Sequence, residues 1–417
     1  MESKATRAKP KSNGIGQLSL VEHALCPLDA RKSLGKNTVF DTGYFYSNKQ
    51  RQRRRADVQV FCPLGLSPKD EFYLWGLLAL TLANPDYGDE LFATRYYILR
   101  QLGVIGSSSK GGRQFTELAA ALDRLSVVSY RNSAFYDPVR AEHRKVSFGF
   151  FSYSIPGDEK SNRAWRIKWD PVFIELVKPI GGNLRFNLEL YSRLDPATRR
   201  LFLFLSKIFV RCKTTPKLEL NHLATEILGY SDSQSRRQLK QKVTRSIQKL
   251  SRFGVLAEDS KQVFEEYNHR ILIKLYRGPK FDALSSVPAN IESPLVELLQ
   301  QVGLDARTVR YTIKKYPSKL VSTWADITLA AKERFGMRFF HKSPTAFLLD
   351  NLKHASANQR TAPDWWHEIR KEEAKRQAKK DRQRRKEKLG KAPGPEHISA
   401  CLQGISDTVF AKTNVND

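Results

Sequence analysis

The longest apolar run of the chain, residues 72–83, predicts a buried helix. Ser67 and Pro68 before it match an N-cap and a first-turn proline, and two acids follow in the first turn. A strand at 90–93, helices at 94–102 and 113–125, and strands at 127–131, 145–155 and 165–169 are predicted next. This order of helix, strand, two helices and hairpin is that of a winged helix-turn-helix.

The same order returns about 125 residues later. The pattern predicts a helix at 196–209, a strand at 217–220, helices at 221–228 and 233–252, and a hairpin of 255–264 with 269–275. Three landmarks match in register: Ser67-Pro68 with Asp195-Pro196, Leu102-Gly103 with Leu228-Gly229, and Arg113-Gln114-Phe115 with Arg237-Gln238-Leu239, at offsets of 128, 126 and 124. The sequence therefore predicts a duplicated winged-helix unit.

The remaining segments are predicted to flank these two units. Strands at 38–47 and 57–64 enclose the basic run 49–55, which fits a solvated hairpin turn and a phosphate-contacting arm equally well. Beyond 288, helices at 293–302, 306–315, 319–335 and 343–352 predict a small packing or protein-docking bundle with this core: Leu295, Leu298, Val309, Leu320, Trp324, Phe347 and Leu348. A solvated charged helix is predicted at 365–391 and a disordered end after it.

The predicted fold class is α+β, mainly helical, with two tandem winged helix-turn-helix domains followed by a small helical module and a charged helical tail. The expected division of the chain is as follows: a flexible basic N-terminus (1–36), an N-terminal hairpin with the first winged helix (37–178), the second winged helix (179–280), the helical module (288–356), and the charged helix with its disordered tail (357–417).

The net charge of the chain indicates which class of molecule it binds. There are 71 Lys and Arg against 43 Asp and Glu, a net charge of +28, which indicates a polyanion. The apolar run 72–83 is too short to cross a bilayer, the first residues lack an apolar signal region, and the four cysteines show no zinc-site spacing. We therefore expect a cytoplasmic protein that binds double-stranded DNA and no membrane.

The third helix of the second unit is the predicted DNA reader. Its apolar stripe is Leu239, Val243, Ile247 and Leu250, and the opposite face carries only Arg and Gln. Arg bonds bidentately to guanine and Gln to adenine, so the predicted base-reading residues are Gln234, Arg237, Gln238, Gln241 and Arg245. The flanking cations predicted to bind phosphates are Arg236, Lys240, Lys242, Lys249 and Arg252. The alternative is a solvated basic helix in a domain with another partner.

The third helix of the first unit has mixed charge. It is expected to bury Phe115, Leu118, Leu122 and Leu125 and to show outward Arg113, Glu117, Ala120 and Arg124. Because Glu117 would repel phosphates, this unit is predicted to serve protein contacts or a weaker DNA contact. That weaker contact would use Lys110 and Arg113 with the wing cations Arg140, Arg144 and Lys145.

No catalytic chemistry is indicated. Residues 106–112 resemble a phosphate-binding loop only in composition, and the eight histidines include no His-x-His pair for a strand-nicking metal site. We expect no enzyme activity, metal or cofactor.

The amino-acid sequence resembles that of the plasmid replication initiator protein A family. The resemblance covers 16–280. It rests on three stretches: LVEH and CPL within 20–28, VFCPLGLSP and EFYLW within 60–75, and DPATRRLF at 195–202. In addition, SPTAFLL at 343–349 is similar to C-terminal modules attached to such initiators. It implies binding to repeated origin sites, local melting, and recruitment of the host initiator ATPase and the replicative helicase. A winged-helix transcriptional regulator or autorepressor stays open, as do monomer and homodimer.

Overall fold

The computed structural model describes residues 13–48, 50–83, 88–106, 112–158, 161–179, 181–258, 263–282 and 293–389. Lys49 of the basic run 49–55, Lys110, and the predicted disordered end after 391 lie outside these ranges. The chain forms two compact parts: 1–155 with 160–361, and 156–159 with 362–417. The larger part holds both predicted units and the helical module that follows them.

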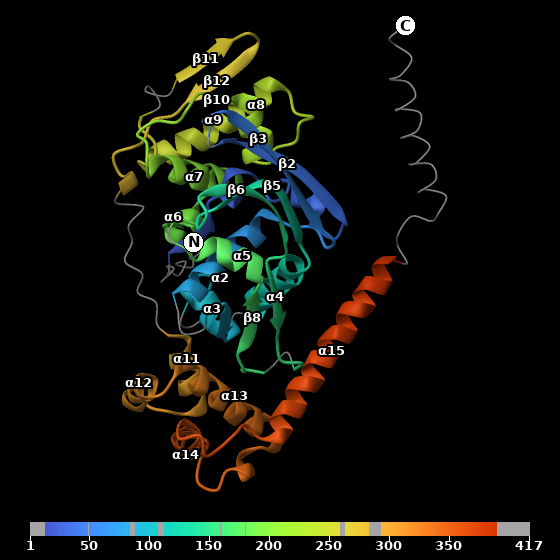
Figure 1. The fold of residues 1–417 in the computed structure, drawn as a ribbon, viewed down its shortest axis with the longest axis vertical. Coiled ribbons are helices and arrows are strands. Elements are labelled where there is room, and N and C mark those ends of the chain that lie inside the picture. The colour runs from blue at the N-terminus through green and yellow to red at the C-terminus, as the bar shows by residue number, and fades with distance from the viewer. Residues whose placement is uncertain are drawn as a thin grey trace, which may run out of the picture. The chain divides into compact units, whose positions relative to one another are not determined.

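The first repeat of the larger part has these elements: α2 (Pro68–Leu82), β4 (Glu90–Ala93), α3 (Arg95–Gln101), α4 (Gly112–Ser126), β7 (Phe151–Ser154) and β8 (Trp165–Trp169) (Figure 1). Ser67 and Asp70 form a capping box at the start of α2, with Pro68 in the first turn. Nearly every residue of α2 is buried, as its continuous apolar run predicts. The three strands pair in the order β4-β8-β7.

The second repeat follows the same plan. Its elements are α7 (Pro196–Phe209), β10 (Leu218–Glu219), α8 (Leu220–His222) continuing into the π-helical turn η3 (Leu223–Ile227), α9 (Arg236–Arg252), β11 (Val263–Tyr267) and β12 (Arg270–Lys274). Its strands pair in the order β10-β12-β11, so both sheets run first, third, second. The topology thus carries the repetition that the three landmarks predicted. Of the strand expected at 255–264, the structure shows β11 from Val263, and Leu256 makes an isolated bridge with Arg277.

A hairpin is inserted into the first repeat between α4 and β7. Strands β5 (Ser129–Asp137) and β6 (Glu142–Phe148) join β2 (Thr38–Ser47) and β3 (Arg53–Cys62) in a sheet of order β2-β3-β5-β6. The expected pairing of 127–131 with 145–155 is confirmed, with Tyr130 opposite Phe148 and Arg131 opposite Ser147, but its assignment as the first wing is wrong because the hairpin belongs to this separate sheet. Strand β5 also pairs along β3, and its Tyr130 and Phe135 side chains are fully buried. Strand β7 pairs with β8, which makes the wing of this repeat.

The basic run also differs from the expected hairpin loop. Arg53, Arg54 and Arg55 lie within β3 and pair in register with β2, so the turn is shorter than predicted. The Arg53 guanidinium lies 4.2 Å from the ring centroid of Phe45 on the neighbouring strand. Cross-strand contact of this kind favours continuing the strand over a solvated loop.

The N-terminal segment is folded from residue 14, in contrast to the flexible 1–36 that we expected. Strand β1 (Gly14–Gln17) pairs with β9 (Asn183–Phe186), and η1 (Leu20–Glu22) and α1 (Ala30–Ser33) follow. The segment is ordered because its sparse apolar residues are buried: Ile15, Leu20, Val21, Ala24, Leu25 and Cys26. Two helices that the sequence reading missed, α5 (Pro171–Val177) and α6 (Leu188–Arg193), lie on either side of β9 in the chain.

The helical module matches its prediction closely. It contains α11 (Pro294–Val302), α12 (Ala306–Lys315), α13 (Ser318–Phe335), the 3₁₀ turn η5 (Met337–Phe339) and α14 (Pro344–Ser356). Most of the predicted core is buried, with Leu320 and Phe347 half-buried. The smaller part of the chain holds the predicted charged helix, α15 (Asp364–Leu389). Among the described residues, every helix is too short or too polar to span a bilayer.

Candidate nucleic-acid interface

Helix α9 is amphipathic in the way its spacing predicts. Leu239, Val243, Ile247 and Leu250 are buried, and α9 packs against α7. The helix begins at a capping box, in which the Ser235 hydroxyl accepts from the Gln238 backbone N–H and the Gln238 side chain accepts from the Ser235 backbone N–H. The cap fixes where the helix starts and therefore which residues face outward.

The outward face of α9 forms a shallow hollow of about 700 Å³. Its lining residues all come from this one helix: Arg237, Gln238, Lys240, Gln241, Thr244, Arg245 and Gln248. Arg237, Gln241 and Arg245 are exposed, and none makes a hydrogen bond or ion pair to the rest of the described chain. These three of the predicted base-reading residues are therefore free to bond to an external partner.

The side chains of the two other predicted base-reading residues make hydrogen bonds within the protein. Gln238 sits in the capping box, and Gln234 lies before the first residue of α9. The Gln234 side-chain oxygen accepts from the Lys242 ammonium at 2.6 Å. Periodicity placed Gln238 on the outward face correctly, but it did not locate the N-cap at Ser235, which leaves Gln234 outside the helix.

The predicted phosphate-binding cations divide in a similar way. Arg252 is exposed and has no ion pair within the described chain, and Lys240 lies 5.7 Å from the ring centroid of Phe264 on β11. Lys249 instead pairs with Asp195, the N-cap of α7, at 3.0 Å. Arg236 lies 3.8 Å from Glu266. Both ion pairs are partly exposed, so they offer little resistance to a competing phosphate.

The tip of the second wing extends this surface and was missed from the sequence. Tyr267 is 64% exposed, and Asn268 and His269 both adopt left-handed backbone conformations between β11 and β12. Arg270 follows them and is exposed. A two-residue loop that needs positive φ at both positions favours Asn, so the Asn268 position was the signal that could have located this turn.

The third helix of the first repeat presents a different surface. Glu117 binds Lys69 at 2.5 Å and Arg113 at 3.3 Å, and the Lys69 hydrogen bond is the main reason the pKa of Glu117 is lowered. Arg124, expected to face outward, turns inward and makes two bonds of 2.6 and 2.9 Å to the buried Asp70. Its direction is set by the packing of α4 against the start of α2, where Asp70 also caps the helix.

The other cations assigned to the first repeat do not lie on its wing. Arg144 and Lys145 belong to β6 of the inserted sheet. Arg140 and Arg144 each bond to Asp137 at 3.1 Å, and these two hydrogen bonds help to lower the pKa of that carboxyl although its burial opposes them. Of this set, only Arg113 stands near the third helix within the described residues, and it is paired with Glu117.

The helical module is anchored on the first repeat. Asp326 of α13 is fully buried and receives bonds from Arg163, which precedes β8 and is 4% exposed, at 3.1 and 3.3 Å. The nearby Ser161 hydroxyl donates to Glu333 at 2.7 Å. A buried, bidentate Arg–carboxylate pair fixes both position and orientation. The module is therefore joined to the segment between the two wing strands.

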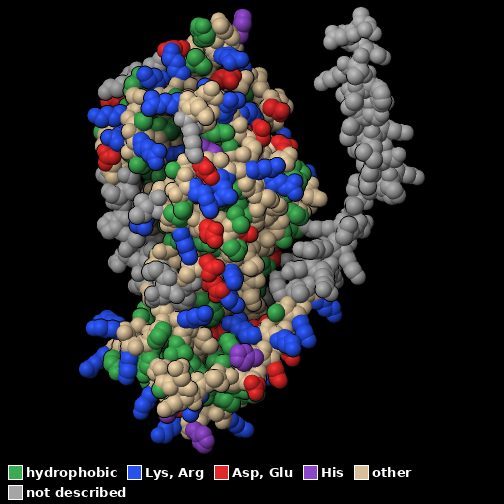
Figure 2. Space-filling model, in the orientation of Figure 1, with side chains coloured by type: hydrophobic (Ala, Val, Ile, Leu, Met, Phe, Trp, Pro, Cys, Tyr) green, Lys and Arg blue, Asp and Glu red, His purple; other side chains and the backbone are tan. Residues whose placement is uncertain are grey.

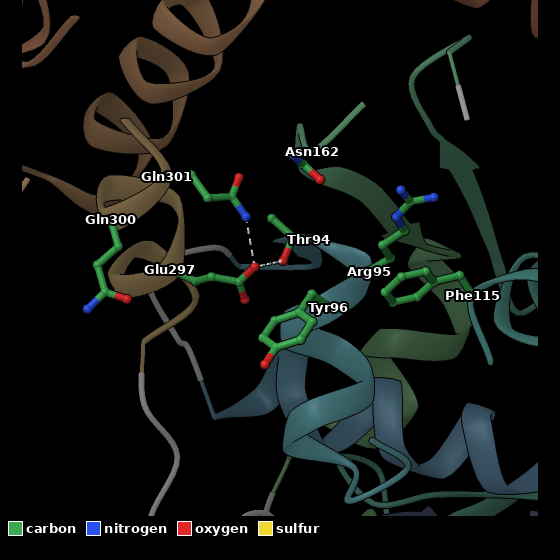
Figure 3. Close-up of a pocket in the computed structure, with 8 residues that line it drawn as sticks. All are labelled: Thr94, Arg95, Tyr96, Phe115, Asn162, Glu297, Gln300 and Gln301. Carbon is green, nitrogen blue, oxygen red and sulfur yellow. Dashed lines mark hydrogen bonds between the residues drawn. The ribbon is translucent and has the colours of Figure 1, made fainter. Parts of the chain in front are cut away.

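A second contact joins the module to the helix-turn-helix itself (Figure 3). The Glu297 carboxylate of α11 accepts from the Thr94 hydroxyl at 2.5 Å and from the Gln301 amide at 2.9 Å. Thr94 is the N-cap of α3, and burial is the main reason the pKa of Glu297 is raised. A pocket of about 480 Å³ lies here, lined by Thr94, Arg95, Tyr96, Phe115, Asn162, Glu297, Gln300 and Gln301. The module thus occupies the start of α3, whereas α9 of the second repeat is open.

Across the ranges that the structure describes, no three His, Cys, Asp or Glu side chains lie close enough together to hold a metal ion. Cys26 and Cys62 are buried, Cys212 is exposed, and none of the three forms a disulfide.

Comparisons with known proteins find a likeness in structure but none in sequence. No protein-family model matches the chain, and no curated protein matches it in sequence. A crystal structure of selenomethionine derivatives of domain 2 and domain 3 of RctB aligns with a TM-score of 0.41 and 13% identity. The alignment covers 62% of this chain and 96% of that one.

Proposed function

We propose that this chain is a sequence-specific double-stranded DNA-binding protein that initiates replication at repeated sites in a plasmid origin. The observation that carries the proposal is the outward face of α9, where Arg237, Gln241 and Arg245 stand exposed and unpaired on the third helix of a winged-helix topology. In a helix-turn-helix this helix enters the major groove with its outward residues at base edges.

Electrostatics support duplex DNA as the partner. Figure 2 shows Lys and Arg side chains dense over the end of the molecule that holds the second repeat. Cations of α9 and of the wing tip would neutralise phosphates on both sides of the groove and release counterions. With about six to ten phosphate contacts, affinity would fall roughly 10³- to 10⁵-fold between about 50 and 200 mM salt.

The two repeats have separate roles in this proposal. The second repeat reads sequence through α9. The first repeat has an acid, Glu117, on its third helix, and the module covers the start of its α3, so it contributes protein contacts rather than base contacts. This division follows from the residues at each surface, since both repeats share one strand order.

The initiator role rests on the resemblance of residues 20–28, 60–75 and 195–202 to the plasmid replication initiator protein A family. From that resemblance we infer local melting of the origin and recruitment of the host initiator ATPase and the replicative helicase. A winged-helix regulator would use the same α9 face at a promoter.

Selection of bound fragments from the replicon that encodes the chain tests the proposal. At about 150 mM salt with competitor DNA, we expect enrichment of direct repeats beside an AT-rich stretch. Enrichment of a lone promoter palindrome would favour the regulator. If nothing is enriched over competitor, sequence-specific reading by α9 is wrong.

A further inference from the structure

Helix α12 of the C-terminal module carries a second basic surface, far in sequence from α9. Val309 and Thr312 are its buried residues, and they face the rest of the module. Its exposed residues include Arg307, Arg310, Tyr311, Lys314 and Lys315. Figure 2 shows Lys and Arg side chains at the edge of the module where α12 lies in Figure 1.

These exposed residues form one continuous stripe. Positions 307, 310, 311, 314 and 315 are three or four residues apart, which places them side by side along one face of a helix. From residue 307 to residue 315 the helix rises about 12 Å. The stripe is therefore long enough to follow a few successive phosphates of a nucleic-acid strand.

The charge of this stripe is not balanced within the protein. No acid occurs between Asp305 and Asp326, and no Asp or Glu of the described chain pairs with Arg307, Arg310 or Lys314. On α4 and α15, by contrast, exposed cations have acidic neighbours one turn away, as in the Arg113–Glu117 and Arg376–Glu372 pairs. Like charges at this spacing destabilise a helix unless an external anion neutralises them.

An aromatic ring lies in the middle of the stripe. Tyr311 is 59% exposed, and its hydroxyl accepts from Lys315 at 2.9 Å. The Lys315 ammonium lies 5.1 Å from the Tyr311 ring centroid and 5.4 Å from that of Tyr316. An exposed ring with cations around it is the arrangement by which proteins stack an unpaired base while holding its phosphates.

We propose that the α12 stripe is a binding site for single-stranded DNA. Tyr311 stacks a base, and Arg307, Arg310 and Lys314 contact the phosphates that flank it. A duplex offers the cations their phosphates but offers the ring no exposed base face, which is why the occupant is a single strand. The site is distinct from the α9 face and does not depend on duplex reading there.

Fluorescence anisotropy with the full chain tests this site. Two labelled probes of equal length are used at about 150 mM salt: an oligonucleotide of about 20 thymidines, and an abasic oligonucleotide that keeps the phosphates but has no bases. We expect Tyr311→Ala to weaken thymidine binding by about five- to 150-fold and to leave abasic binding unchanged. Tyr311→Phe keeps the ring and should bind as the wild type does.

Charge variants separate this site from general basicity. Arg310→Ala combined with Lys314→Ala should weaken both probes, whereas Lys353→Ala, which removes an exposed cation on α14 of the same module, should weaken neither. The proposal is overturned if Tyr311→Ala binds thymidine like the wild type, or loses both probes equally. Arg237→Ala should reduce duplex binding alone, so failure of the α9 proposal is seen separately from failure of this one.

Discussion

Glu71 of α2 and Arg200 of α7 form a buried ion pair that joins the first helices of the two repeats. Arg200 donates to Glu71 at 2.6 and 3.1 Å, and also to the Leu228 carbonyl at 2.8 Å. Burial alone would lower the pKa of Arg200, but the Glu71 carboxylate raises it above its ordinary value. The Arg200 side chain of α7 thus bonds both to α2 and to the end of the second helix of the second repeat.

The same interface contains the reciprocal contact. The N-caps Ser67 and Asp195 are 195 − 67 = 128 residues apart, so Glu71 corresponds to Arg199 and Phe72 to Arg200. Glu71 contacts Arg200, and the Arg199 guanidinium lies 5.8 Å from the Phe72 ring centroid. Exchange of contacts between equivalent positions is what a twofold relation produces. The duplication therefore extends from topology to the contact between the repeats.

Arg200→Ala is expected to destabilise the protein by about 3 to 5 kcal/mol, because it leaves the Glu71 carboxylate buried without a partner. Urea unfolding followed by tryptophan fluorescence measures the loss. Glu71→Leu combined with Arg200→Met should recover most of it, since neither charge then remains unpaired. A double variant as unstable as the single one would contradict this account of the pair.

Arg237→Ala and Arg245→Ala are each expected to cost about 1 to 3 kcal/mol in binding and to relax specificity at one base position. Lys240→Ala should weaken all sequences alike, because a phosphate contact carries no sequence information. Competition binding against a panel of single-base variants of the selected site measures both effects. Uniform losses from all three substitutions would place the reading face elsewhere.

Gln238→Ala separates capping from reading. Loss of the capping box at Ser235 and Gln238 should cost about 1 kcal/mol of stability, and Ser235→Ala is the matched control with a similar loss. If Gln238 also reads a base, its substitution alone lowers discrimination at one position. Equal binding by the two variants would assign Gln238 to the cap only.

Much of the fold could be predicted because several helix starts are marked locally. The Ser67-Pro68 and Asp195-Pro196 pairs begin α2 and α7 where expected. The four-stranded sheet could not be predicted, because the pairing of β5 with β3 depends on residues about 70 positions apart. Likewise, only tertiary contacts reveal that residues 14–33 are folded.

The residues of the candidate site could likewise be predicted from the sequence only in part. Helical periodicity placed Arg237, Gln241 and Arg245 on the outward face of α9 correctly. Periodicity cannot show which side chains the protein itself engages, as for Lys249 with Asp195. The Ser-x-x-Gln spacing at Ser235 was a readable capping signal that would have removed Gln234 from the helix.

Asp326→Asn should loosen the module from the first repeat. It leaves Arg163 buried beside a neutral amide, a change expected to cost about 3 to 5 kcal/mol. Hydrogen exchange should then rise in Trp165–Trp169 as well as in α13, whereas Glu333→Gln keeps an acceptor for Ser161 and should raise neither. Faster exchange confined to α13 would show that the module is not coupled to the wing.

Stability should fall as the pH is lowered from about 6.5 to about 4 because of His23. Its Nδ1 donates to the Ala24 carbonyl and its Nε2 accepts from the Tyr130 hydroxyl, both at 2.9 Å. Burial is the main cause that lowers the pKa of His23 to about 4, so the folded protein keeps this ring neutral in that window while the unfolded chain takes up a proton. The expected loss from this group is roughly 3 kcal/mol. His222, with a pKa also lowered to about 4, acts in the same window. Urea unfolding across this pH range should therefore show a smaller decline in His23→Gln than in the wild type, and an unchanged slope would mean that His23 is protonated in the folded state.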